Sequence, residues 1–296
     1  YRRQRQMCIR DRTESTMKGR KFMRRKVEEY LRSTGRLNIS MLEVDLDFCR
    51  GFINFLRTAK NKRLKNEERT ISNCTGLQTQ AVLTAALNTA LRDGIIERNP
   101  MTLLTSKERF HQQESQRVYL TIDELKRMMA TPCDDGELKK AFLFACFTGL
   151  RLSDIRTFTW NKVLTTPNDS PRYIRVRMLK TQQVVNVPLS KDALGYLREM
   201  EDGDEPIFRL SSAASVIEQR LAEWAKKAGI EKHVTFHVSR HSYATMMLTI
   251  GVDIYTVSKL LGHKNVATTQ IYAKIINKKK DDAVSLIDDA FSDMEF

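Results

Sequence analysis

The sequence has few cysteines, and none of them has the spacing that cysteine chemistry requires. Its five cysteines are odd in number and never form a C-x-x-C pair, which argues against a disulfide framework and against a cysteine zinc site. The chain also lacks any run of about 18 apolar residues and any charged-then-apolar leader. These absences predict a protein that neither spans a membrane nor is exported, and we expect it in a reducing cytoplasm.

Two kinds of phosphate chemistry lack their usual sequence motifs. The chain contains no G-x-x-x-x-G-K-[ST] loop for nucleotide phosphates and no carboxylate cluster suited to two magnesium ions. No internal repeat or low-complexity tract is evident. The sequence therefore predicts neither a cofactor nor a metal.

Positive charge, in contrast, is abundant and unevenly distributed. Lys and Arg total 50 against 36 Asp and Glu, a net charge of +14. Residues 1–118 carry 25 basic and 13 acidic side chains, a net +12, whereas residues 119–296 carry 25 and 23, a net +2. Basic charge favours nucleic acid as a partner, although ribosomal and membrane-surface proteins share it.

The N-terminal part of the chain has the apolar periodicity of helices. The predicted helices cover residues 22–32, 42–58 and 70–93. Residues 1–12 begin without Met and match no such pattern, so we interpret them as non-native sequence. The charged stretch 60–69 is either a solvated loop or a contact with a DNA backbone. A polar stretch at 106–117 predicts an interdomain linker.

The C-terminal part combines helices with a β-hairpin. Thr121 and Glu124 form a capping-box pattern at the start of a helix, and an apolar helix follows Gly136. Alternating apolar residues at 173–178 and 184–188 predict the hairpin. Further helices are predicted at 190–200, 211–228, 239–250, 253–261 and 266–275. We divide the chain into a non-native or disordered leader at 1–19, a helical domain at 20–106, a linker at 107–118 and an α-rich domain at 119–296.

Four of the five histidines lie between residues 233 and 263. Three of these four belong to the phrases H-V-S-R-H at 237–241 and L-G-H at 261–263. T-G-L-R precedes them at 148–151, and Tyr272 follows. Opening a phosphodiester without a metal requires a nucleophile, cations for the phosphoryl oxygens, and a proton for the departing 5′ oxygen. Arginine suits the second task because its planar guanidinium stays charged and offers paired donors. A free tyrosine has a pKa of roughly 10, so as a nucleophile it needs a base or a strongly positive surrounding.

On these residues the chain resembles the tyrosine recombinases, the phage-integrase type of site-specific recombinase, over residues 20–296. Residue type, order and spacing agree with the family's catalytic set, which matches Arg151, Lys180, His237, Arg240, His263 and Tyr272. The resemblance implies a mainly α fold, with a helical SAM-like core-binding domain and an α-rich catalytic domain that contains a small antiparallel β-sheet. It also implies that Tyr272 forms a 3′-phosphotyrosine link to DNA, which the 5′ hydroxyl of another strand reverses without ATP or metal.

The resemblance also assigns supporting roles around the nucleophile. His237 is implied as the proton acceptor or an orienting group, His263 as a donor to a non-bridging oxygen, and Lys180 as the general acid. His241 is implied as a packing or supporting residue. Because Asp154 lies three residues after Arg151 on one helical face, we expect it to hold that arginine or a neighbour in place.

The expected function is integration or excision of a mobile element. DNA inversion and chromosome-dimer resolution use the same chemistry, type IB topoisomerase-like relaxation is a related alternative, and a catalytically silent DNA-binding regulator is an alternative of a different class. The expected partners are double-stranded DNA, copies of the chain that assemble from monomers into a homo-tetramer on DNA, and accessory DNA-bending or directionality proteins. Many members of the family carry a further N-terminal arm-binding domain, which we expect to be absent here or lost upstream.

Some of these residues have a second interpretation. His237 and His241, four residues apart, suit a helical zinc pair, although Arg240 between them would repel a cation and no third ligand is near in sequence. Tyr243 and Tyr255 are nominal rivals to the nucleophile, but both lie in apolar helical context, where a buried aromatic is the default.

The C-terminal segment from residue 281 is acidic and amphipathic, with six acidic and no basic side chains. It either covers the chain's own core or, as the resemblance implies, docks on a neighbouring protomer and links the subunits of a tetramer.

Overall fold

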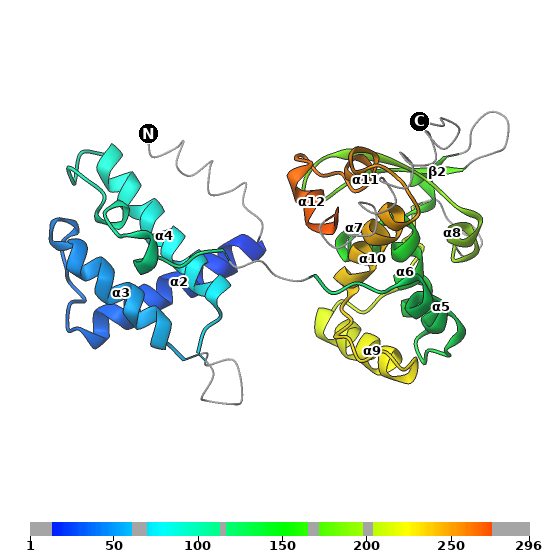
Figure 1. The fold of residues 1–296 in the computed structure, drawn as a ribbon, viewed down its shortest axis with the longest axis horizontal. Coiled ribbons are helices and arrows are strands. Elements are labelled where there is room, and N and C mark those ends of the chain that lie inside the picture. The colour runs from blue at the N-terminus through cyan, green and yellow to red at the C-terminus, as the bar shows by residue number, and fades with distance from the viewer. Residues whose placement is uncertain (1–13, 61–69, 113–116, 165–171, 198–203, 274–296) are drawn as a thin grey trace, which may run out of the picture. The chain divides into compact units, whose positions relative to one another are not determined.

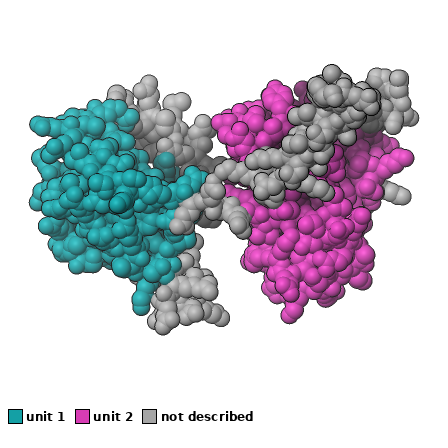
Figure 2. All heavy atoms as spheres, in the orientation of Figure 1, with its two compact units in different colours: residues 1–115 teal, residues 116–296 magenta. Residues whose placement is uncertain are grey.

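The computed structural model describes residues 14–60, 70–112, 117–164, 172–197 and 204–273. The chain forms two compact units, residues 1–115 and 116–296, which Figure 2 colours separately. The predicted acidic segment 281–296 and nearly all of the charged stretch 60–69 lie outside the described residues. Within them, no helix is both long and apolar enough to cross a bilayer.

The first unit consists of helices, as predicted. Its elements are α2 (Glu14–Ser33), η1 (Met41–Glu43), α3 (Leu46–Thr58), α4 (Asn73–Arg92), η2 (Pro100–Thr102) and η3 (Ser106–Glu108). Asp45 and Ser72 accept backbone N–H bonds at the starts of α3 and α4, which satisfies donors that a helix leaves unpaired. The first helix begins at Glu14, so residues 14–19 are helical rather than part of a disordered leader.

The core of this unit is aromatic and aliphatic. Tyr30 of α2 packs against Phe48, Phe52 and Phe55 of α3, with ring centroids 5.2–5.5 Å apart. Leu87 of α4 is fully buried in the same cluster. Each of the three helices therefore buries its apolar face in one common core, as the apolar periodicity predicted.

The segment that we expected to open the linker is instead tied to the first unit. Glu108 of η3 accepts a hydrogen bond of 2.7 Å from Arg50 of α3, and Gln80 of α4 accepts one of 2.9 Å from the amide of Phe110. The polar composition that suggested a linker supplies contacts to α3 and α4, and the boundary between the units falls at residues 115 and 116.

The second unit is α-rich with one small sheet. Its elements are α5 (Ile122–Ala130), α6 (Gly136–Thr148), α7 (Leu152–Arg156), η4 (Trp160–Lys162), β1 (Val163–Leu164), β2 (Tyr173–Arg177), β3 (Val184–Pro188), α8 (Lys191–Gly195), α9 (Ala214–Lys227), α10 (Phe236–Thr249), α11 (Ile254–Leu260) and α12 (Ala267–Ala273). The sheet is antiparallel in the order β1-β2-β3, and Ile174 of β2 pairs with Val163 and Val187. The predicted hairpin is confirmed, whereas β1 was not predicted because two residues are too short to show a pattern.

Helix α6 forms the centre of this unit. Its apolar residues are buried along nearly the whole helix, and it packs against α10. Phe142 meets Trp224 and Phe236 edge to face, at centroid distances of 5.9 and 5.8 Å. The predicted capping box of Thr121 and Glu124 is present at the start of α5. This core supports α10 and the turns that carry the predicted site residues.

Candidate active site

Helix α10 supplies three of the polar side chains of the site. His237, Arg240 and His241 occupy positions i, i+3 and i+4 and therefore share one face of the helix. The helix begins at Phe236, three residues before the predicted start, so all three belong to a single regular element. Figure 1 shows α10 beside α11 and α12, and both helices contact it.

Arg240 is only 1% exposed and connects two turns. Its Nη1 donates to the carbonyl oxygen of Gly149 at 2.7 Å, and its Nη2 donates to that of Leu261 at 2.5 Å. Gly149 lies two residues before Arg151, and Leu261 lies two residues before His263. The buried guanidinium therefore fixes the two turns that carry the next two predicted site residues.

The same turns require glycine. Gly149 has φ +70°, and a Cβ atom there would lie 2.7 Å from Tyr243 Cδ1. Gly262 has φ +62°, and a Cβ atom there would lie 2.8 Å from Val185 Cγ1 of β3. A side chain at either position would combine a disfavoured backbone conformation with a steric clash, so the T-G-L-R and L-G-H phrases need their glycines for close packing.

Arg151 is the N-cap residue of α7 and is half-buried. Its Nη1 is buried and has no hydrogen-bond partner among the described residues. Desolvation lowers the pKa of Arg151, whereas the acidic groups of Asp154 and Tyr272 raise it. The guanidinium remains a cation at neutral pH and keeps a donor available for an anion.

Asp154 holds the hairpin turn. It is 1% exposed, and its Oδ1 accepts a hydrogen bond of 2.9 Å from the amide of Leu179. Lys180 is the next residue and is exposed in the turn between β2 and β3. We expected Asp154 to hold Arg151 or a neighbour; the bond goes to the hairpin that carries Lys180, while the carboxylate acts on Arg151 through its charge.

Desolvation and the cationic surroundings together keep His237 and His263 neutral. Desolvation, followed by the charges of Arg240 and Arg151, lowers the pKa of both His237 and His263 to about 4. The charge of Lys180 also acts on His237. The Nδ1 of His263 is 2.8 Å from the Oγ1 of Thr269, which orients its ring.

Tyr272 of α12 is 3% exposed, and its hydroxyl meets His241. The distance from its Oη to Nδ1 of His241 is 2.7 Å, so the nearest histidine is His241 and not His237, the implied proton acceptor. Burial raises the pKa of Tyr272, whereas the charges of Arg240 and Arg151 oppose that rise. The phenol therefore lies within the electrostatic field of both arginines.

Arg117 also acts on this group and was not part of the predicted set. Desolvation is the largest influence on the pKa of His237, His241 and Tyr272, and at least one other charge acts more strongly than Arg117 on each of them. The positive charge of Arg117 lowers all three pKa values as a smaller contribution. Nearby, the amide of Leu120 donates to Ser242 Oγ of α10 at 2.8 Å. Arg117 lies at the start of the second unit and belongs to no motif, so no sequence signal marked it.

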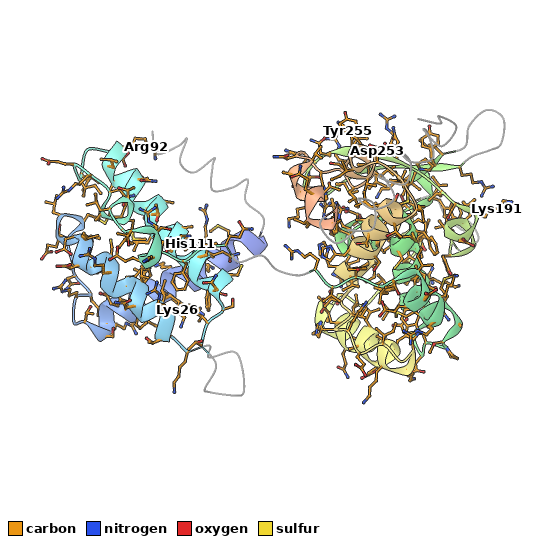
Figure 3. All side chains as sticks on the ribbon, in the orientation of Figure 1. Lys26, Arg92, His111, Lys191, Asp253 and Tyr255 are labelled. Carbon is orange, nitrogen blue, oxygen red and sulfur yellow. The ribbon has the colours of Figure 1, made fainter. Side chains whose placement is uncertain are left out.

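The nominal rivals of Tyr272 have other environments. Tyr243 is buried, and desolvation raises its pKa to about 12. Tyr255 is 58% exposed, at the surface in Figure 3, with Lys259 Nζ 5.0 Å from its ring centroid, so the expectation that it is buried was wrong. Among the described residues, no group of three or more His, Cys, Asp or Glu is arranged to hold a metal.

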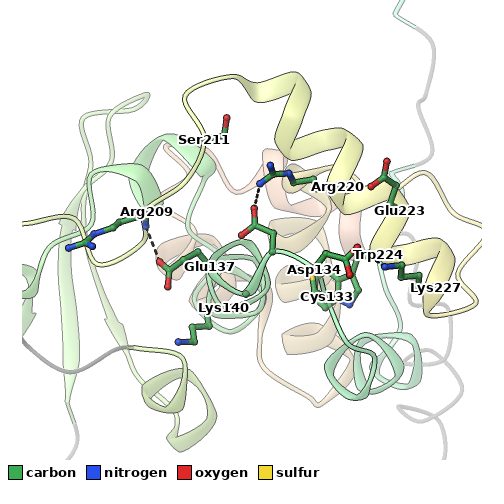
Figure 4. Close-up of a pocket in the computed structure, with 12 residues that line it drawn as sticks. Cys133, Asp134, Glu137, Lys140, Arg209, Ser211, Arg220, Glu223, Trp224 and Lys227 are labelled. Atoms are coloured by element: carbon green, nitrogen blue, oxygen red, sulfur yellow. Dashed lines mark hydrogen bonds and ion pairs between the residues drawn. The ribbon is translucent and has the colours of Figure 1, made fainter.

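A hollow of about 910 Å³ lies elsewhere on the second unit (Figure 4). Two of its cations form ion pairs, Arg220 with Asp135 at 2.5 Å and Lys227 with Asp134 at 2.6 Å. None of the predicted site residues lines it. Because two of its cations are already paired and none of the predicted site residues lines it, we place the chemistry at the cluster around α10 and not in this hollow.

Both parts of the chain match known sequence families. The profile of the phage integrase family matches residues 118–279, and that of the phage integrase SAM-like domain matches residues 4–110. The second match includes most of the segment that we interpreted as non-native. Together the two profiles span most of the chain.

Individual proteins are similar to this chain over about two thirds or more of its length. A tyrosine recombinase of Thermosipho africanus (strain TCF52B) is 29% identical over 288 residues, which cover 93% of this chain and 94% of that protein. Tyrosine recombinase XerC of Yersinia pestis is 30% identical over 210 residues, 66% of each chain. A lambda integrase dimer bound to a COC′ core site superimposes with a TM-score of 0.68 at 18% identity, covering 92% of each chain. The Tn1549 transposon integrase in complex with a circular intermediate DNA gives 0.66 at 19% identity, covering 88% of this chain and 90% of the integrase.

Proposed function

Because this chain belongs to the phage integrase family, whose tyrosine recombinases break and rejoin DNA strands at specific sites, we propose that Tyr272 is the nucleophile of its reaction. The observation that carries the proposal is geometric: the buried Oη of Tyr272 lies 2.7 Å from Nδ1 of His241, the residue next to the buried Arg240 on α10. The charges of Arg240 and Arg151 also oppose the rise that burial causes in the pKa of the phenol. Positive charge stabilises the phenolate that attack requires.

The proposed reaction is a phosphoryl transfer in two reversible steps. The Oη of Tyr272 passes its proton, with the assistance of His237, to solvent and forms a bond to the phosphorus, while the bond from phosphorus to the 5′ oxygen breaks. The departing 5′ oxygen takes a proton from Lys180, and a 3′-phosphotyrosyl link remains. A 5′ hydroxyl of another strand then attacks the phosphorus and releases Tyr272, so the number of phosphoester bonds is unchanged.

The two arginines divide the work of binding the phosphate. Arg151 offers the buried Nη1 that has no partner among the described residues, and we assign it a direct bond to a non-bridging oxygen. Arg240 donates one hydrogen from each Nη to a backbone carbonyl. It therefore contributes its charge, its Nε and its remaining hydrogens while it holds both turns in place.

The neutral histidines complete this division. His263, oriented by Thr269, donates a ring N–H to the other non-bridging oxygen in our assignment. His237 is exposed on the same face of α10 and assists the transfer of the nucleophile's proton. Both functions suit rings that carry no charge of their own beside two arginines.

The biological role that we propose is integration or excision of a mobile element. The fold shared with the Tn1549 transposon integrase and the lambda integrase supports this role. Chromosome-dimer resolution, which uses the same chemistry, is the second candidate. The proposed partners are double-stranded DNA, bound by the basic first unit as well as the second, and further copies of the chain in a tetramer on that DNA. The cytoplasm is the proposed location.

Trapping of the covalent intermediate tests the nucleophile. The full chain is incubated in EDTA with a nicked duplex that spans the inverted repeats beside its gene, and an SDS-resistant protein–DNA adduct is expected. Tyr272→Phe should lose the adduct but retain binding in a mobility-shift assay, because only the reacting oxygen is removed. Adduct formation by Tyr272→Phe, or loss of the adduct in a Tyr255→Phe variant that still binds DNA, would reject the assignment.

A further inference from the structure

The hydroxyl of Tyr272 has a defined neighbour. Its Oη lies 2.7 Å from Nδ1 of His241, and the two ring centroids are 5.5 Å apart with an interplanar angle of 50°. Tyr272 is 3% exposed and His241 is 7% exposed. A contact this short between two buried groups joins α12 to α10 through the oxygen that reacts.

The protonation of the pair sets the direction of this hydrogen bond. Desolvation, followed by the charges of His237 and Arg117, lowers the pKa of His241 to about 3, so its ring is neutral at pH 7. Burial raises the pKa of Tyr272, so the phenol keeps its proton. A neutral ring carries its proton on one of its two nitrogens. Because the described residues offer the hydroxyl no acceptor other than Nδ1, we assign the ring proton to Nε2, so that the hydroxyl donates and Nδ1 accepts.

Without this acceptor the hydroxyl would be buried in an apolar cluster. The ring of Tyr272 packs with Tyr243, Leu248, Val257 and Leu261, none of which supplies a hydrogen bond to Oη in the structure. An unsatisfied buried hydroxyl costs about 1–3 kcal/mol, so the phenol would rotate or leave its place. The bond to His241 is thus what fixes the reactive oxygen within the apolar cluster.

His241 is itself held from a second side. The ring of His237 meets it edge to face, with centroids 4.5 Å apart and an interplanar angle of 79°. Arg240, which anchors the turns before Arg151 and His263, is the adjacent residue on α10. Position 241 therefore connects the cationic cluster to the element that carries the nucleophile.

We propose that His241 is a positioning residue for Tyr272, which it holds by accepting a hydrogen bond from the phenol so that the oxygen faces the scissile phosphate in a fixed direction. This inference rests on the proposed role of Tyr272 as nucleophile. The resemblance implied only a packing or supporting residue at this position, whereas the proposal names the atom that His241 holds and the bond that holds it. Correct orientation of a nucleophile is worth large factors in rate, and a displacement of 1 Å can cost about 100-fold.

Two substitutions separate positioning from packing. His241→Asn keeps a side-chain oxygen close to where Nδ1 lies, whereas His241→Leu has similar bulk and no acceptor. Both are made in the full chain, and the rate of adduct formation is measured in single turnover on the nicked duplex used for Tyr272→Phe. His233→Asn, at an exposed position that the structure places outside the cluster, is the matched control.

We expect His241→Leu to slow adduct formation by about 10- to 100-fold at saturating DNA, with DNA affinity changed by less than about twofold. His241→Asn should remain within about fivefold of wild type, because it restores the acceptor, and His233→Asn should match wild type. Mobility-shift binding by each variant confirms that it is folded.

Three outcomes would overturn the proposal. A wild-type rate for His241→Leu would mean that the hydrogen bond does not matter, and a faster rate would mean that it restrains the nucleophile. Equal slowing in His241→Asn and His241→Leu would mean that the imidazole itself is required, as for a proton acceptor. An adduct that persists in Tyr272→Phe would instead reject the proposed function, so the two failures are distinguishable.

Discussion

The two units of the molecule treat a buried cation differently. In the first unit, Lys26 is 4% exposed, and its Nζ lies 2.8 Å from the carboxylate of Glu29. In the second unit, Arg240 is 1% exposed, and its hydrogen-bond acceptors are the carbonyl oxygens of Gly149 and Leu261. The carboxylate of Glu29 neutralises the charge of Lys26. The carbonyl oxygens satisfy two hydrogen-bond donors of Arg240 but do not neutralise its charge. The charge that remains in the second unit is therefore available to a phosphate.

This difference extends to the buried polar residues as a group. In the first unit they are Lys26, Thr79, Gln80 and Asn99. In the second unit they are Thr148, Asp154, Ser239, Arg240, His241, Ser242, Thr245, Ser258 and Thr269, which gather on α10 and the elements around it. Burying a polar group is unfavourable unless its hydrogen bonds are made. In the first unit, Gln80 and Asn99 tie the segments at Phe110 and η2 to α4. The second unit concentrates such groups where the reaction is proposed to occur.

Removal of the two cations should have very different consequences. Arg240→Met leaves two buried carbonyl oxygens without their donor, so we expect a loss of about 2–4 kcal/mol in the free energy of unfolding and no detectable adduct. Lys26→Met removes the partner of Glu29, whose carboxylate is already partly exposed and can bind water instead. We therefore expect a loss of only about 1 kcal/mol in the free energy of unfolding. Denaturant unfolding of the full chain measures both, and equal losses would contradict the distinction between the units.

Glycines of similar backbone conformation provide a second contrast. Gly149 has φ +70° and Gly94 has φ +71°, but only at Gly149 would a Cβ atom meet another residue, 2.7 Å from Tyr243. We expect Gly149→Ala to lower stability by about 3 kcal/mol, from backbone strain plus steric overlap, and Gly94→Ala by about 1 kcal/mol, from strain alone. Thermal unfolding of the two variants is the measurement. A larger loss for Gly94→Ala would mean that the turn before Arg151 is loosely packed.

A fall in pH should lower the stability of the second unit before that of the first, and the difference between the units should be smaller than for the substitutions above. The pKa of His241 is lowered to about 3 in the folded state, so its neutral form stabilises folding fully above the ordinary value of about 6.5 and less as pH falls below it. The loss is at most about 1.4 kcal/mol per pH unit for this residue. In the first unit, hydrogen bonds from Thr105 and Arg50 lower the pKa of Glu108 to about 2, so that contribution is lost only as pH falls from about 4.5 toward 2.

Hydrogen exchange between pH 7 and pH 5 checks this order. Amides of α10 should lose protection over this range, while those of α3 should keep theirs after correction for the intrinsic rate. His241→Asn should reduce the loss in α10, since it removes the titrating ring. Equal loss in both helices would contradict the expectation.

The motif residues and most elements could be predicted from sequence. The helix Ile122–Ala130 begins and ends where the capping box and the apolar spacing placed it, and the β2–β3 hairpin carries Lys180 in its turn. The prediction failed where local pattern and tertiary contact differ. The segment from Ser106 to Phe110 looked like a linker because it is polar, but its polar groups bond to α3 and α4, and no periodicity records such partners.

By itself, the sequence determined which residue types are available to the candidate site and in what order, because the arginines, histidines, lysine and tyrosine of the motifs have fixed positions along the chain. Only the tertiary structure decided which of those groups touch. The bonds from Arg240 to Gly149 and Leu261 span 91 and 21 residues, and the bond between Tyr272 and His241 spans 31. Contacts of that range depend on how α6, α10 and α12 pack, and packing is set by side-chain shape across the whole core, which no local spacing encodes.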